Sequence, residues 1–126
     1  HSNSIYQLAL MRFIESGELD RHIKRMKKIY RKRRDMLLEL MHSCFGEKVH
    51  IHGASAGMHV VAEFEGAVFS EDRIKRLLSA GVYVVPVERH ALKKGDHENQ
   101  IILGYAGLER DTLLRGLQAI KDELQH

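Results

Sequence analysis

The spacing of apolar residues changes once along this chain, and the change limits the folds that it can adopt. Before Gly46 apolar residues recur every three or four positions, as in helices, whereas from Lys48 onward several short runs alternate apolar and polar residues, as in strands. Long helices followed by short strands and helices predict an α+β fold, in which a small, mostly antiparallel sheet has helices packed on one side. The 126 residues are enough for one such domain but not for two.

Two helices are predicted ahead of the sheet. The first covers residues 4–15, with Ser4 as its N-cap. Its apolar residues occupy more than one face, so we expect the segment 1–17 to pack on a missing large domain or on another subunit. The second helix is long and basic, covers about 18–42, and opens the domain itself, which we place at 18–126.

Shorter elements follow the long helix. The strands are predicted at 48–52, 58–64, 82–87 and 100–105, with helices between Ser70 and Gly81 and over 111–124. Small residues at 53–57 (GASAG) separate the first two strands. The polar stretch 88–99 is expected to form a loop or a lid.

The long helix carries most of the clustered positive charge in a chain with 20 basic and 17 acidic residues, a formal net charge of +3. Such a helix can bind nucleic-acid phosphates. We favour a solvated surface, because the charges ring the helix, no aromatic residues interleave with them, and acidic residues elsewhere cancel most of the excess. The basic residues are Arg21, Lys24, Arg25, Lys27, Lys28, Arg31, Lys32, Arg33 and Arg34.

Other candidate chemistry is sparse. His50 and His52 point the same way on one strand and His59 lies on the next, a trio that suits zinc, but no cysteine or carboxylate stands at ligand spacing. Cys44 has only His42 nearby, where the two side chains diverge, and is expected to be a small buried hydrophobe. From these residues alone we predict no catalytic set and no metal site.

The composition favours a cytoplasmic protein. A single cysteine cannot form an internal disulfide, and no apolar run approaches the roughly 20 residues that cross a bilayer, so we expect no membrane contact. The chain opens on His1 instead of methionine, and we therefore expect it to be part of a longer protein.

Four segments of the chain carry a family resemblance. The segments GASAGMHVVAEFEG, LLSAGVYVVPVERHAL and QIILGYAGL, in this order after HIKRMKKIYRKRRDMLLELM, resemble the C-terminal small domain of fold type I pyridoxal-phosphate aminotransferases. Within that superfamily the chain is most similar to the MocR branch of the GntR transcriptional regulators, through HIKRM, YRKRRD and LGYAGL. The resemblance covers most of the chain.

The resemblance implies a sensing role in a longer regulator. Pyridoxal phosphate would be bound by a lysine of a large domain upstream, so no catalytic or cofactor-binding residue is expected in this chain. The longer protein would bind an amino-acid-like effector, contact DNA through a separate winged helix, and form a homo-oligomer. The alternative is the small domain of a genuine class I aminotransferase, and residual aminotransferase activity of the longer protein is left open.

Three residues are expected to face the effector. In aminotransferases the last strand of the small domain usually supplies an arginine that binds the substrate carboxylate, and the resemblance places Ile102 there. His59 occupies the position of an aromatic residue that faces the substrate, and His90 lies near the mouth of the site. A second interpretation of His59, as a simple rim residue of its strand, stays open.

Overall fold

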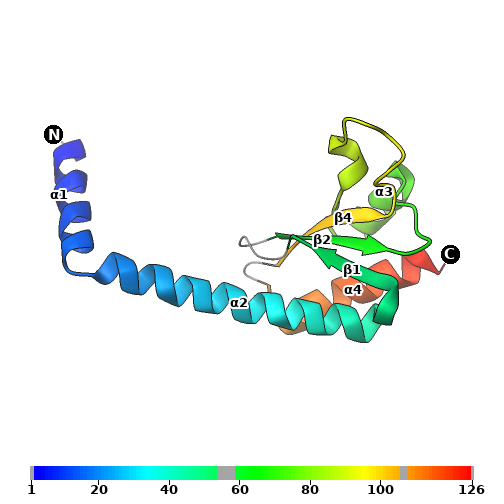
Figure 1. Ribbon diagram of the computed structural model, residues 1–126, viewed down its shortest axis with the longest axis horizontal. Helices are drawn as coiled ribbons and strands as arrows, with labels where there is room; N and C mark the ends of the chain where they lie inside the picture. The colour runs from blue at the N-terminus through cyan, green and yellow to red at the C-terminus, as the bar shows by residue number, and fades with distance from the viewer. Residues whose placement is uncertain (1, 54–58, 106–107, 126) are drawn as a thin grey trace.

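The chain forms four α-helices and one four-stranded sheet (Figure 1). The computed structural model describes residues 2–53, 59–105 and 108–125. The α-helices are α1 (Ser2–Glu15), α2 (Glu18–Phe45), α3 (Glu71–Ser79) and α4 (Arg110–Leu124), and the strands are β1 (Val49–His52), β2 (His59–Phe64), β3 (Val85–Pro86) and β4 (Gln100–Gly104). Two 3-10 helices, η1 (Gly46–Lys48) and η2 (Val87–His90), complete the order.

The sheet has the strand order β1-β2-β4-β3, and every pair is antiparallel. One row of paired residues runs across it, from His52 to Val61, Ile102 and Val85. Paired residues in an antiparallel sheet point to the same face, so the register alone divides the side chains into two faces. The predicted α+β fold with a small antiparallel sheet is confirmed.

One face of the sheet forms the hydrophobic core with three helices. β2 and β4 contribute side chains that alternate with more exposed neighbours, as expected for strands with one covered face. α2, α3 and α4 cover this face with apolar residues at helical spacing. The core residues of the two strands are Val60, Ala62, Phe64, Ile101 and Leu103, and those of the helices are Leu37, Leu40, Met41, Ile74, Leu77, Leu113, Leu117 and Ile120.

α2 is packed along only part of its length. Its buried residues, Leu37, Leu40 and Met41, all lie in the C-terminal half. The N-terminal half extends past the sheet and α4, and α1 turns away from it at the far end (Figure 1). The turn is made by Gly17, whose φ of 78° lies in the left-handed region that favours glycine.

α1 exposes its apolar side chains. Ile5 is 70% exposed, and four further large apolar residues of this helix are about half exposed or more: Leu8, Leu10, Met11 and Ile14. A single turn of chain joins α1 to the rest, so the described residues bury little of this surface. No described helix is both long and apolar enough to cross a membrane.

Three details differ from the sequence prediction or lie outside the described residues. The first helix already includes Ser2, so Ser4 lies inside the helix and is not its cap. The strand predicted over 82–87 is reduced to Val85–Pro86, because proline lacks the N–H for further pairing and η2 begins at the next residue. The segment 54–58, which includes most of GASAG, lies outside the described residues.

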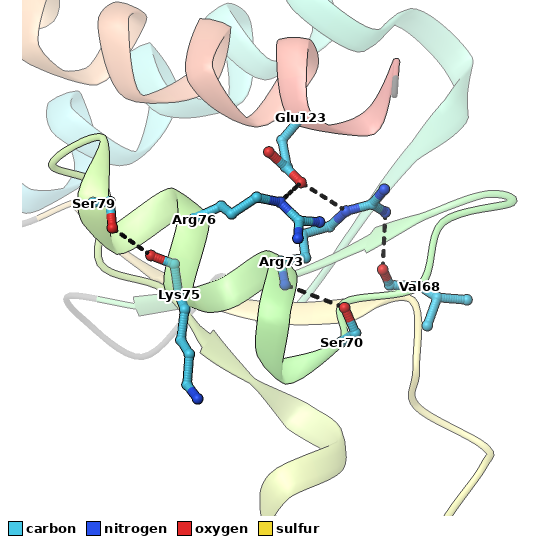
Figure 2. Close-up of polar contacts among 7 residues, drawn as sticks. All are labelled: Val68, Ser70, Arg73, Lys75, Arg76, Ser79 and Glu123. Atoms are coloured by element: carbon cyan, nitrogen blue, oxygen red, sulfur yellow. Dashed lines mark hydrogen bonds and ion pairs between the residues drawn. The ribbon is translucent and has the colours of Figure 1, made fainter.

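Two arginines of α3 connect this helix to α4 (Figure 2). Arg76 Nε donates to Glu123 Oε1 at 2.7 Å, and Arg73 Nε lies 3.5 Å from the same oxygen. The hydrogen bond from Arg76 lowers the pKa of Glu123 below its ordinary value, with Arg73 adding to the effect against some desolvation. Arg73 also donates to the Val68 carbonyl at 2.9 Å, so the same side chain holds the segment that leads into α3.

The N-cap of α3 provides a test of this packing. The Ser70 hydroxyl accepts the Arg73 backbone N–H at 3.2 Å (Figure 2). Ser70→Ala should therefore lower the free energy of unfolding by about 1 kcal/mol in urea denaturation. Ser79→Ala is the matched control, because that hydroxyl only donates to the Lys75 carbonyl one turn back, and it should change stability by less than about 0.5 kcal/mol. Equal effects of the two changes would contradict the cap assignment.

Candidate functional site: the open face of the sheet

The side chains on the face away from the helices form what we call the open face. β2 shows the division most clearly, since His59, Val61 and Glu63 are exposed or half-buried while the residues between them are buried. The strand register adds further residues to the same face. The open face consists of His50, His52, His59, Val61, Glu63, Val85, Gln100 and Ile102.

Ile102 lies at the centre of the open face. It pairs with Val61 on one side and Val85 on the other, so three half-buried β-branched side chains form an apolar row across β2, β4 and β3. His59 pairs with Gly104, two residues further along β4. His59 is thus the diagonal neighbour of Ile102 on the same face, within reach of a shared ligand.

His90 lies elsewhere. β3 runs antiparallel to β4, so the chain leaves β3 beside Ile101 and continues away from Gly104. η2 then carries His90, which is exposed, beyond that end of the sheet. Of the three residues predicted to face the effector, the structure brings His59 and Ile102 together and leaves His90 at the opposite end of the strands.

A polar network that sequence reasoning missed occupies this opposite end. Gln100 Nε2 donates to Glu63 Oε1 at 2.8 Å, and His97 Nδ1 lies 3.1 Å from Gln100 Oε1. His52 Nε2 is 3.8 Å from the same carboxylate oxygen of Glu63. The network joins β1, β2, β4 and the loop before β4, and only the register of the strands shows that these distant residues meet.

The histidines of β1 are committed to carboxylates. His50, His52 and His59 do share one face, as their spacing predicts. His50 Nε2 donates to Glu65 Oε1 at 2.8 Å, which raises the pKa of His50 above its ordinary value of 6.5. Among the described residues no group of three or more histidine, cysteine, aspartate or glutamate side chains is arranged to hold a metal ion. Cys44 is half-buried against the core, as a small hydrophobe would be.

The loop from Glu88 to His97 is held by a single carboxylate. Glu88 accepts the backbone N–H of Gly95 and, at 3.0 Å, that of His97. The hydrogen bond from Gly95 lowers the pKa of Glu88 below its ordinary value, and the bond from His97 and the charge of Lys94 act in the same direction against desolvation. Lys94 Nζ donates to the Glu88 carbonyl at 2.7 Å. The stretch predicted as a loop or lid is thus an organised loop that begins with η2.

An apolar cavity lies on the other side of the sheet. Its volume is about 250 Å³, and it lies between α4, α2 and the residues before β3. Its lining includes Val82, Leu108 and Gly116 but no lysine or arginine. It has no group that could form an imine or bind a phosphate.

Comparison with known proteins supports a regulator origin. No family model matches the chain. It is 34% identical to the HTH-type transcriptional regulator YhdI of Bacillus subtilis, over 91% of the chain and 24% of that regulator. It is 28% identical to the probable rhizopine catabolism regulatory protein MocR of Rhizobium meliloti, over 93% of the chain and 24% of that protein. Aromatic-amino-acid aminotransferase 1 of Thermococcus litoralis is 23% identical over 98% of the chain and 30% of its own length.

Solved structures of aminotransferases share the fold. The multiple substrate aminotransferase of Thermococcus profundus superposes with a TM-score of 0.76 at 24% identity, over 90% of this chain and 28% of the enzyme. The α-aminoadipate aminotransferase LysN of Thermus thermophilus gives 0.74 at 24% identity, over 94% and 30%. The chain spans about a quarter of the regulators it matches. The predicted resemblance to the C-terminal small domain of aminotransferase-like regulators is confirmed.

Removing the charge of Glu88 tests how the loop is held. In Glu88→Gln the amides of Gly95 and His97 should exchange hydrogen at least several-fold faster, because the neutral amide accepts more weakly than the carboxylate. Glu98→Gln, in the same loop but with no described side-chain hydrogen bond, is the control and should leave both rates unchanged. A depressed pKa stabilises the fold above the ordinary value of 4.5, and this contribution is lost as the pH falls from 4.5 through the lower folded-state value. An NMR titration of Glu88 that ends at or above 4.5 would contradict the arrangement.

Proposed function

We propose that this chain, a C-terminal aminotransferase-like small domain related to the MocR-type regulators, is part of the effector-sensing region of a GntR-family transcriptional regulator. The order of the similarities supports this, since two regulators are 34% and 28% identical to the chain and the aminotransferase of Thermococcus litoralis is 23% identical. The chain spans about a quarter of these regulators, so contact with operator DNA is assigned to a segment of the longer protein outside it.

The observation that carries the proposal is the apolar row around Ile102. An arginine at this position would present a planar fork for a carboxylate. Isoleucine, between Val61 and Val85, offers only hydrocarbon. This argues against the alternative of an ordinary amino-acid aminotransferase and favours a site that recognises its ligand without turning it over rapidly.

His59 is the polar group that we assign to the effector. It is exposed, neighbours Ile102, and has no described hydrogen bond or ion pair, unlike His50 and His52. An amino-acid-like effector would place its apolar part over Ile102 and a polar group at His59. The sheet would then close over the effector as a hinged cover, with α2 as the connection to the rest of the protein.

Pyridoxal phosphate fits the longer protein and not this chain. The apolar cavity is lined by neither lysine nor arginine, and no charged or polar residue among the described ones is buried. The cofactor supplies an aldehyde that bonds to a lysine amine. We assign that lysine to the region outside this chain, and we expect the chain alone neither to bind the cofactor nor to transaminate.

α1 is assigned to an interface with that outside region or with a second subunit. Its exposed apolar residues, including Ile5 and Met11, form a surface larger than isolated surface hydrophobes require. The relatives are about four times as long as this chain, so a covering domain is available in them. A homo-oligomer of the longer protein is part of the same proposal.

The role of His59 is tested in the longer protein. His59→Ala should weaken effector binding about tenfold, measured by titration of free amino acids, with the cofactor absorbance unchanged, because only a side chain on the cover is lost. His50→Ala, on the same face but bonded to Glu65, is the control and should retain the affinity. Unchanged affinity in His59→Ala would remove the assignment. Amino-acid turnover of about 1 s⁻¹ or faster would establish the aminotransferase alternative instead.

The assignment of α1 is tested on the chain alone. The isolated 126-residue chain should self-associate at high concentration in light scattering, because the apolar surface of α1 lacks its cover. Leu8→Gln with Met11→Gln should shift it toward a monomer. Leu78→Gln with Leu92→Gln removes two apolar side chains that are also exposed but lie elsewhere, and should not. A monomeric parent chain would count against the proposal.

A further inference from the structure

The exposed half of α2 carries its positive charge on one side. Seven basic residues of this half are exposed, and at 3.6 residues per turn they fall within an arc of about 160°. The centre of that arc is opposite the stripe formed by Leu37, Leu40 and Met41, which packs into the core. Arg33 and Arg34 lie outside it and are half-buried. We call the seven residues the basic arc: Arg21, Lys24, Arg25, Lys27, Lys28, Arg31 and Lys32.

This arrangement corrects the sequence interpretation. The charges do not ring the helix evenly, because the two remaining arginines lie outside the arc, and one of them turns toward the body of the domain, where Arg33 Nη1 donates to the Leu108 carbonyl at 3.1 Å. None of the seven residues of the basic arc forms an ion pair with an acidic side chain in the described part of the chain. Acidic residues flank the segment at Asp20 and Asp35, but none occurs within it. The arc is therefore a continuous stretch of uncompensated positive charge.

We infer that the basic arc binds the phosphate backbone of duplex DNA. Together with the proposed function, which brings operator DNA to the longer protein, this makes α2 a second, sequence-independent contact beside the reading domain. From Arg21 to Lys32 the helix rises about 16 Å, the axial length of about five nucleotides of one strand. About four phosphates can then be neutralised.

The residue types indicate backbone contact and not base reading. Lysine and arginine are suited to phosphate, whereas reading single-stranded bases requires aromatic platforms. Tyr30 is the one aromatic residue of this half, and it is half-buried on the other side of the helix. A lipid surface is less favoured, because the partly exposed apolar residues, such as Ile23 and Met26, also lie on the side away from the arc.

The test is salt-dependent binding of the 126-residue chain to a labelled duplex, followed by fluorescence anisotropy. Four phosphate contacts give a slope of log K against log salt of about −3.6. Lys24→Gln, Lys28→Gln and Arg31→Gln together should reduce the magnitude of the slope by about 2.7, and glutamine preserves the helix. The matched control is Lys75→Gln, Arg115→Gln and Lys121→Gln, which removes three exposed charges elsewhere and should leave the slope within about 1 of the parent value.

The outcomes separate the possibilities. Equal losses in the two triple variants would reduce the effect to net charge and overturn the inference. The absence of duplex binding at about 50 mM salt, where charges act over more than about 10 Å, would overturn it as well. Binding of the parent chain to phosphatidylserine vesicles but not to duplex would assign the arc to a lipid surface instead.

Sequence independence is a separate requirement. Two duplexes of unrelated sequence should bind alike, because phosphates carry no base information, and a preference of about tenfold would overturn backbone recognition. The effector titration of the longer protein does not depend on these results, so each proposal fails separately.

Discussion

The contact on which the structure depends is the packing of the C-terminal half of α2 against one face of the sheet. Leu37 and Met41 are almost completely buried there, together with the apolar stripe of α4. Burial of a leucine or methionine side chain contributes on the order of 2 kcal/mol, and the helix places three such residues on one stripe. This contact fixes which face of the sheet is covered, and hence which face is open.

The open face follows from alternation. Once Val60 and Ala62 face the helices, His59 and Val61 must face away, because a strand has a period of two. The same rule, applied through the register, brings Ile102 beside Val61 and Gln100 beside Glu63. A row of aliphatic side chains with a histidine at one end and a polar network at the other is therefore a consequence of a few residues of register and not of a continuous motif.

Much of the fold can be predicted from the sequence, and less of the site. Periodicity locates all four α-helices within a few residues, and the cap at Ser70 is recognisable because its partner lies three residues away. The contact between Gln100 and Glu63 cannot be found in this way, since it joins residues 37 positions apart and depends on strand register. Composition overestimates the strand at 82–87, because β-branched residues indicate extended chain, while pairing also depends on the partner strand and on Pro86.

The basic arc shows why a count of charges is a poor guide to a charged surface. Nine basic residues look evenly distributed until two of them are seen to lie outside the arc and half-buried. The remaining seven stand on a helix whose other half is packed on the sheet, so arc and open face belong to one packed unit. Arg21 lies about 24 Å along the helix from Leu37, so a rotation of the sheet by about 10° moves it by about 4 Å. Closure of the sheet on a ligand and displacement of the arc are thus the same motion, which gives ligand binding a direct mechanical route to the charged end of α2.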